Sequence, residues 1–338
     1  ANPDRKHAAS GGSSQVNAKY ELTALDGLRQ LAGTRIDIIT ARGYDIVKDG
    51  KANASLLKEA VKVAAGADIV IYVGGWIHGY SDAWEDNAFD SETLDKTSIM
   101  LPFGQNELIS AIQKANPNVI VVLYGGAATD MTPWVAGCKA IIQAWYPGME
   151  GGKALAGIIF GDINPSGKLP MTFPKKLQDS PAHTLGEYPG GGVVNYNEGL
   201  LVGYRYFDTK KVEPLYPFGY GLSYTTFNFD NLVVEKKENE VVVKLTVKNV
   251  GPVAGAEVVQ VYVHDKVSRL ERPDKELKAF QKVFLEPGET KEVELHLQEN
   301  AFQYYDDSKR QWFLETGEFQ ILVGNSSKNI ILTGEVSF

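Results

Sequence analysis

Two different periodicities of apolar residues divide the chain. In the first half, stretches with apolar residues every three or four positions alternate with short continuous apolar runs. This alternation is typical of amphipathic helices and buried parallel strands in βαβ units. It predicts helices at residues 20–31, around 56–64, 104–115 and 152–160, and strands at residues 35–40, 69–73, 119–124, 140–145 and 168–173. We therefore expect a doubly wound α/β domain with four or five parallel strands and helices on both faces.

In the last third of the chain, apolar and polar residues alternate with a period of two. Seven short strands follow from this pattern, and turn sequences such as Glu286-Pro-Gly288 separate them. The predicted strands cover residues 240–248, 257–264, 277–285, 290–297, 311–314, 318–323 and 330–338. About seven short antiparallel strands in some 110 residues are typical of an immunoglobulin-like or fibronectin-type β-sandwich.

An irregular segment rich in glycine, proline and aromatic residues joins the two patterns. Its rings are more typical of structural packing at a crossing between domains than of a binding surface. The predicted organisation is an α/β sandwich domain at residues 1–190, an aromatic-rich crossing at 191–228 and a fibronectin type III-like domain at 229–338.

Composition narrows the classes of function. The chain has 338 residues, 43% of them hydrophobic, and a net charge of −8 with scattered Lys and Arg. This distribution has no basic patch for nucleic acid or for an anionic membrane, and no apolar stretch reaches the eighteen or so residues of a membrane span. Cys138 is the single cysteine and the five histidines have no ligand-like spacing, so we expect no metal site. A hydrolysis that uses carboxyl groups alone would need no cofactor.

The connection from Trp76 to Pro102 stands out between a predicted strand and a predicted helix. At roughly twenty-five residues it is much longer than usual for such a link, and loops of this length are often functional. It mixes aromatic rings with carboxylates, as carbohydrate sites do, although a solvated acidic loop has the same composition. Glycoside hydrolysis commonly uses one carboxyl group as acid/base and another as nucleophile. Spacing alone does not choose the acid among Glu85, Asp86, Asp90 and Glu92.

Several motifs, taken together and in order, resemble the β-glucosidases of glycoside hydrolase family 3. They are Ser91-Glu-Thr-Leu-Asp-Lys96 followed by Met100-Leu-Pro102 and Gln105, Asn116-Pro-Asn-Val-Ile-Val-Val-Leu123, Ala144-Trp-Tyr-Pro-Gly-Met-Glu-Gly-Gly152, Gly161-Asp-Ile-Asn-Pro-Ser-Gly-Lys-Leu-Pro170, Asn197-Glu-Gly199, Val202-Gly-Tyr-Arg-Tyr206 and Pro217-Phe-Gly-Tyr-Gly-Leu-Ser-Tyr-Thr-Thr-Phe227. The resemblance covers almost the whole chain and implies an α/β sandwich followed by a fibronectin type III-like domain, in agreement with the periodicity.

The resemblance also ranks the candidate residues. It implies that Glu92, three residues before Asp95, is the acid/base, although Thr93 and Lys96 replace the usual Gly and Arg of the motif. Glu85 is the second choice. Ser13 is similar to a serine that related enzymes offer to the sugar. On physical grounds alone, Trp76 and Trp84 are expected to line an outer sugar subsite.

Family members also have an N-terminal (β/α)8 barrel that carries the nucleophilic aspartate, and these 338 residues contain no barrel pattern. The resemblance therefore implies the C-terminal portion of a retaining, exo-acting β-glucosidase, with the barrel as a missing part or a separate chain and a β-glucoside or oligosaccharide as substrate. The alternatives are a noncatalytic carbohydrate-binding or scaffold module and a β-xylosidase. A homodimer is left open, and a periplasmic or extracellular location is expected from the habit of the family alone.

Overall fold

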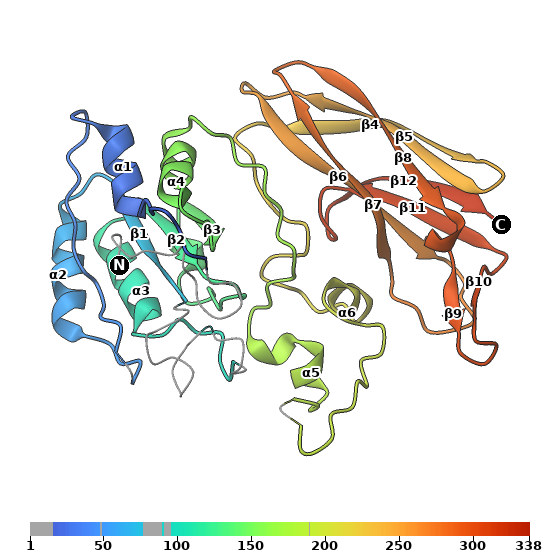
Figure 1. Cartoon of the computed structure of the whole chain (residues 1–338), viewed down its shortest axis with the longest axis horizontal. Helices are drawn as coiled ribbons and strands as arrows, with labels where there is room; N and C mark the ends of the chain where they lie inside the picture. The colour runs from blue at the N-terminus through green and yellow to red at the C-terminus, as the bar shows by residue number, and fades with distance from the viewer. Residues whose placement is uncertain (1–15, 48, 77–89, 91–95, 189) are drawn as a thin grey trace. The chain divides into compact units, whose positions relative to one another are not determined.

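A computed structural model describes residues 16–47, 49–76, 90, 96–188 and 190–338 of the chain. It divides into two compact units, Ala1–Ile163 and Asn164–Phe338 (Figure 1). The predicted boundaries at residues 190 and 228 remain a prediction, since a division into compact units does not define the limits of three domains.

The first unit is built on a parallel sheet. Its described strands are β1 (Val70–Gly75), β2 (Val119–Tyr124) and β3 (Ala140–Trp145), hydrogen-bonded in that order and all parallel. The central strand β2 is almost wholly apolar and buried, as expected for a strand covered on both faces. The predicted α/β class is confirmed.

Helices pack in pairs against this sheet (Figure 1). One pair is α1 (Ala24–Ala32) with α4 (Gly151–Phe160), and the other is α2 (Ala54–Ala65) with α3 (Gln105–Ala115). A short 3-10 helix, η2 (Val135–Gly137), precedes β3. Ala24 and Leu155 of the first pair share a core cluster with Val73 and Val122 of the sheet. On α3, Gln105 hydrogen-bonds to Tyr72 of β1.

Local sequence determines where these helices begin. At α1, the Thr23 hydroxyl accepts the N–H of Asp26, and the Asp26 carboxylate accepts the N–H of Thr23 in return. At α2, the Asn53 side chain accepts the N–H groups of Ser55 and Leu56. Such caps satisfy N–H groups that the first turn of a helix leaves without partners.

The strand predicted at residues 35–40 is not formed, and among the described residues the parallel sheet has three strands rather than four or five. Ile36 and Ile39 in this segment are 49% and 66% exposed. Alternating apolar residues are not sufficient for a strand, because a neighbouring backbone must also supply hydrogen bonds. The segment predicted as a strand at 168–173 makes one isolated antiparallel bridge, from Phe173 to Tyr216.

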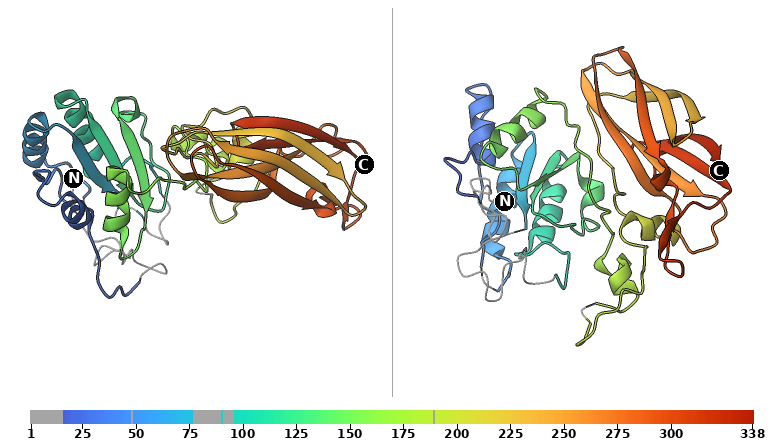
Figure 2. Two further views of the ribbon diagram at one scale, coloured as in Figure 1. Left: turned by 90° about the horizontal axis from the view of Figure 1, so that it is seen from above. Right: turned by 45° about the vertical axis from the view of Figure 1, so that its right-hand side comes forward.

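The second unit contains a sandwich of two antiparallel sheets whose long strands lie alongside one another (Figure 2). One sheet has the order β12-β11-β6-β7 and the other the order β4-β5-β8, and β9 and β10 form a separate hairpin. The strands are β4 (Phe227–Lys236), β5 (Glu240–Asn249), β6 (Gly255–Asp265), β7 (Glu276–Leu285), β8 (Thr290–Gln298), β9 (Tyr304–Asp306), β10 (Gln311–Phe313), β11 (Glu318–Gly324) and β12 (Ile330–Ser337). The 3-10 helix η4 (Glu299–Ala301) follows β8.

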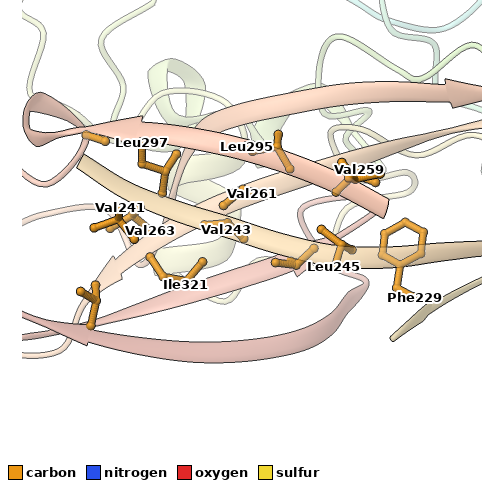
Figure 3. Close-up of a cluster of buried hydrophobic side chains, with 14 of the residues drawn as sticks. Phe229, Val241, Val243, Leu245, Val259, Val261, Val263, Leu295, Leu297 and Ile321 are labelled. Atoms are coloured by element: carbon orange, nitrogen blue, oxygen red, sulfur yellow. The ribbon is translucent and has the colours of Figure 1, made fainter. Parts of the chain in front are cut away.

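A single apolar cluster fills the space between the two sheets (Figure 3). Alternate residues of β5, namely Val241, Val243, Leu245 and Val247, are at most 1% exposed. This inward-facing row is the period-two pattern read from the sequence, so the predicted β-sandwich is confirmed.

The part of the second unit that precedes β4 is irregular, with three short helices, η3 (Leu177–Asp179), α5 (Pro181–Thr184) and α6 (Tyr204–Thr209). Tyr204 of α6 stacks on Phe218 and meets the ring of Tyr262 of β6 edge-on. Its hydroxyl also accepts the N–H of Leu277. Tyr204 therefore packs against the sandwich, whereas Tyr196 and Tyr224 of the same segment are 79% and 47% exposed.

Candidate functional site

The carboxyl ends of the three parallel strands have an unusual backbone. Gly75 ends β1 with φ 124°, Gly125 follows β2 with φ 139°, and Trp145 ends β3 with φ 53°. A positive φ at a non-glycine residue is uncommon, and such conformations are enriched at functional sites. The register between β2 and β3 also shifts here, at Leu123 and Tyr124.

Close approach explains why glycine stands at the ends of β1 and β2. A Cβ atom on Gly75 would lie 2.0 Å from the Tyr124 carbonyl oxygen, and one on Gly125 would lie 2.6 Å from the Trp76 ring. Both distances are shorter than any contact that real Cβ atoms make. The chain therefore leaves the sheet in a conformation that packs Trp76 directly over the end of β2.

Gln105, the first residue of α3, ties together the two ends of the connection that begins at Trp76. Its side chain is fully buried, and its carbonyl oxygen accepts the Tyr72 hydroxyl at 2.7 Å and the Gly75 N–H at 2.8 Å. Its amide nitrogen donates to the carbonyl oxygens of Gly75 and Pro102 at 2.9 and 3.0 Å. One amide thus fixes both the exit from β1 and the return into α3.

The returning segment is anchored by apolar side chains. Ile99, Leu101 and Phe103 are buried, with exposures of 6%, 5% and 2%, and Phe103 stacks on Tyr44. The Ile99 carbonyl accepts the Asp130 N–H at 2.8 Å, and the Phe103 N–H donates to the Gly50 carbonyl at 2.8 Å. This part of the long connection is therefore packed structure rather than solvated loop.

Asp90 is a buried carboxylate at this edge of the sheet, 9% exposed. Its carboxylate forms an ion pair with Lys96 at 2.8 Å, accepts the Gly126 N–H at 2.8 Å, and accepts the Tyr146 hydroxyl. Burial acts to raise the pKa of Asp90, but the Lys96 ammonium and these hydrogen bonds outweigh it and bring the pKa below the usual value. Asp90 therefore stays ionised at neutral pH.

Lys96 lies between a carboxylate and an aromatic ring. Its ammonium is 3.8 Å from the centre of the Trp76 ring as well as 2.8 Å from Asp90. Burial lowers the pKa of Lys96, and the charge of Asp90 offsets part of that effect. Trp76 itself is 4% exposed, and its indole N–H donates to the Thr129 hydroxyl at 2.9 Å. The ring is thus locked in place beneath the ammonium group.

The structure describes one of the five site residues predicted from the sequence. Trp76 lies at the end of β1, where its observed partners are Lys96, Thr129 and Gly125. Its contact with a sugar remains a prediction. Glu92, Glu85, Ser13 and Trp84 lie outside the described residues.

The electrostatics of Asp90 bear on the choice among the four loop carboxylates. A general acid needs a raised pKa so that it holds a proton near neutral pH. The lowered pKa and the fixed ion pair of Asp90 fit the opposite role, a permanent charge that binds Lys96. The observed surroundings of Asp90 thus do not favour it as the acid.

Two residues that hold this site together were not singled out as site residues from the sequence. Gln105 and Lys96 both stand in motifs that carry the resemblance, yet spacing gives no indication that Gln105 bonds back to Gly75 or that Lys96 turns toward Asp90. Over the described ranges, no group of three His, Cys, Asp or Glu side chains could hold a metal ion, and no helix is long and apolar enough to cross a membrane.

Comparison with protein-family models assigns both parts of the chain. Residues 1–224 match the glycosyl hydrolase family 3 C-terminal domain, and residues 257–327 match the fibronectin type III-like domain. Together the two models cover most of both units.

Individual proteins are similar over nearly the full chain. A β-glucosidase of Bacteroides ovatus is 41% identical over all of this chain and 46% of its own length. An exo-α-(1→6)-L-arabinopyranosidase of Bifidobacterium breve is 40% identical over 97% of this chain and 42% of its own length. The crystal structure of a family 3 β-glucosidase of Bifidobacterium adolescentis covers 97% of this chain with a TM-score of 0.87 and 38% identity, and the match spans 47% of that protein. The chain thus spans about half the length of these relatives.

Proposed function

The chain belongs to glycosyl hydrolase family 3, and on that premise we propose that it provides the acid/base half of a retaining, exo-acting β-glucosidase. The observation that carries the proposal is the 41% identity with a β-glucosidase over the whole of this chain. In this proposal the nucleophilic aspartate belongs to a (β/α)8 barrel that is not among these 338 residues. The substrate is a β-glucoside or cello-oligosaccharide that loses its terminal glucose.

Glu92 has the role of proton donor and acceptor in this mechanism. It protonates the glycosidic oxygen while the aspartate attacks the anomeric carbon, so the aglycone leaves and a covalent glycosyl-enzyme forms. Glu92, now a carboxylate, then takes a proton from the water that attacks the anomeric carbon and releases glucose from the aspartate. The two carboxyl groups of a retaining site lie about 5–5.5 Å apart, so the barrel must approach the carboxyl edge of this sheet.

The anchored connection supports this placement. Gln105 fixes both ends of the segment that contains Glu92, and three buried side chains hold its return into α3. Ligands of open α/β sheets bind beyond the carboxyl ends of the strands, which is the edge from which this segment leaves.

Substitution of Glu92 in the full-length polypeptide tests the proposal. With Glu92→Gln, we expect kcat/KM for cellobiose, which has a poor leaving group, to fall by about 10²–10⁴-fold, as for loss of a general acid. For 2,4-dinitrophenyl β-glucoside the loss should be much smaller, because its leaving group needs no proton. The measurement is the steady-state rate on both substrates.

Glu85→Gln is the matched control for this experiment. If Glu85→Gln and not Glu92→Gln shows the dependence on the leaving group, the acid/base role moves to Glu85. If neither variant shows it, the acid/base proposal is wrong, and the noncatalytic carbohydrate-binding or scaffold alternative is favoured.

A second candidate is action on pentopyranosides such as β-xylosides, with the same catalytic groups. The observation in its favour is the 40% identity with a protein named as an exo-α-(1→6)-L-arabinopyranosidase. Nitrophenyl β-glucoside, β-xyloside and α-L-arabinopyranoside compared on one enzyme preparation decide between the two. A kcat/KM that is highest for either pentoside would replace the glucosidase proposal with this one.

A further inference from the structure

Residues 190–202 of the second unit expose an unusual number of large hydrophobic side chains. They form an irregular segment that leads into α6 (Figure 1). Single exposed hydrophobic residues are common on protein surfaces, but a group of them indicates a contact surface. Five such side chains in this segment are 52–79% exposed, namely Val193, Val194, Tyr196, Leu200 and Val202.

The segment is attached to the rest of the second unit, so these side chains have a defined place at the surface. The Asn197 side chain donates a hydrogen bond to the Glu187 carboxylate. The Leu201 N–H donates to the Glu198 carbonyl oxygen at 2.9 Å. The Leu201 side chain is 6% exposed and belongs to a buried cluster with Tyr206 of α6. Leu201 therefore anchors the segment, while the residues on either side of it stay exposed.

The charge of this surface is negative. Glu198 is the one charged residue among residues 190–202. The Oε2 atom of Glu198 is withdrawn from water and has no hydrogen-bond partner within the part of the chain that the structure describes. Because buried carboxylate oxygens normally accept hydrogen bonds, a Lys or Arg of a partner would satisfy this atom. The surface thus fits a partner that is apolar and carries a basic group.

The length of the relatives indicates which partner this is. The chain spans 46% of the β-glucosidase of Bacteroides ovatus and 47% of that of Bifidobacterium adolescentis. About half of each relative therefore lies outside the match, which is enough for a further domain. Domains of one polypeptide bury part of their surface against each other, and an apolar group at the surface of one domain is a place for such a contact.

We propose that residues 190–202 form a docking surface for the barrel-containing half of the full-length polypeptide. The apolar side chains pack against that half, and a Lys or Arg of that half faces Glu198. Tyr196 is the central contact, since it is the most exposed of the five and exposed tyrosines commonly carry much of the energy of an interface. The inference rests on the proposed function in one respect, which is the presence of the barrel.

Labelling of a thiol placed in the segment tests the proposal. Val193→Cys is made both in this chain and in the full-length polypeptide, and its rate of reaction with a maleimide is followed by mass spectrometry of the peptide that contains residue 193. We expect the reaction to be at least about tenfold slower in the full-length polypeptide, because a covered thiol reacts only after the contact opens. The matched control is Val267→Cys, between β6 and β7, where the native side chain is 82% exposed. It should react equally fast in both proteins.

Second substitutions in the full-length polypeptide test the two parts of the contact. Tyr196→Ala, added to Val193→Cys, should raise the labelling rate by about threefold or more, because it removes the central apolar contact. Glu198→Gln should raise the rate by a smaller factor, since it removes the charge that faces the basic group. Both variants should leave labelling of Val193→Cys in this chain alone unchanged.

Equal labelling of Val193→Cys in the two proteins would overturn the docking proposal. Slow labelling already in this chain alone would overturn it as well. In that case a rate that falls with protein concentration would assign the surface to a second copy, and a rate independent of concentration would assign it to another part of the same chain. Labelling does not depend on catalysis, so a failure of Glu92→Gln to show leaving-group dependence would reject the proposed function and leave this result intact.

Discussion

Two buried ion pairs, Asp90–Lys96 in the first unit and Asp208–Lys275 in the second, are built differently. Asp90 accepts directed hydrogen bonds from Gly126 and Tyr146 in addition to its contact with Lys96. Asp208 of α6 lies 3.0 Å from the Lys275 ammonium and 3.4 Å from that of Lys328. Neither of its carboxylate oxygens, however, is in hydrogen-bonding geometry with any described residue.

The difference indicates two uses of buried charge. Hydrogen bonds from the Gly126 backbone and the Tyr146 ring orient the Asp90 carboxylate at the carboxyl edge of the parallel sheet. Around Asp208, two ammonium groups neutralise a carboxylate that holds α6 against the chain entering β7. We expect substitutions at the second pair to change stability and to leave the relative rates on different substrates unchanged.

The largest expected effect on stability is that of Lys275→Met. Removal of one partner leaves a buried charge without compensation, which costs about 3–5 kcal/mol in free energy of unfolding. The loss in free energy of unfolding should lie toward the lower end of this range, because Lys328 still neutralises part of the charge of Asp208. Urea unfolding measures it, and the rate ratio on cellobiose and 2,4-dinitrophenyl β-glucoside should stay as in the wild type.

Lys210→Met is the control for this variant, since Lys210 and Glu271 form an exposed pair at 3.2 Å and should contribute no more than about 1 kcal/mol. A change in the leaving-group ratio in Lys275→Met would contradict the division between the two pairs.

Gln105→Leu has the next largest expected effect on stability. It tests the hydrogen bonds by which Gln105 connects the end of β1 to the start of α3. The variant leaves the buried Gly75 N–H and the Pro102 carbonyl without this partner, at about 1–3 kcal/mol for a buried polar group. We expect a loss on the order of 2 kcal/mol in the free energy of unfolding. If Glu92 is the acid/base, kcat should fall as well, because both ends of the connection that contains it are released. Gln105→Glu keeps an acceptor for Gly75 but places a carboxyl group opposite the Gly75 and Pro102 carbonyl oxygens in a fully buried site, so it should lose at least as much stability. A Gln105→Glu variant as stable as the wild type would contradict the importance of the two donated bonds.

The smallest expected effect is the dependence of stability on acidic pH. Because the pKa of Asp90 is lower in the folded chain than in the unfolded chain, its ionisation stabilises the fold above the unfolded value near 4. That contribution is lost as the pH falls through the lowered folded pKa. In thermal unfolding between pH 5 and pH 2, Asp90→Asn should therefore lose less stability than the wild type. Parallel curves for the two proteins would contradict the lowered pKa.

Asp306 of the sandwich provides an internal reference for that measurement. Hydrogen bonding from Ser308 lowers its pKa to about 2, so its own contribution falls in the same acidic range in both proteins. Subtracting the stability of Asp90→Asn from that of the wild type at each pH therefore cancels the contribution of Asp306.

Sequence periodicity predicted most of the architecture because the elements are long and each has one buried face. It failed where local pattern and tertiary pairing disagree. Residues 35–40 alternate as a strand does but find no pairing strand among the described residues. The sequence predicts no strand at β4, because the rings at its start continue the aromatic-rich segment, whereas Phe229 lies in the sandwich core at 4% exposure.

The candidate site was less predictable than the fold. A motif pointed to Glu92, and this assignment stays a prediction because the residue lies outside the described ranges. The contacts of Asp90, Lys96 and Gln105 depend on how a long connection folds back on the sheet, and no periodicity encodes that path. Sequence could therefore identify the residues of this region but not the contacts that Asp90, Lys96 and Gln105 make.

The packing of Trp76 over Gly125 also constrains how this site can evolve. A side chain at position 125 would occupy the space of the indole ring, and the backbone there has a φ of 139° that suits glycine. Trp76 can be replaced by a smaller residue while Gly125 is kept. Replacement of Gly125 while Trp76 is present would instead create a steric clash. Substitutions at the two positions therefore have a preferred order, and the tryptophan should vary among descendants before the glycine does.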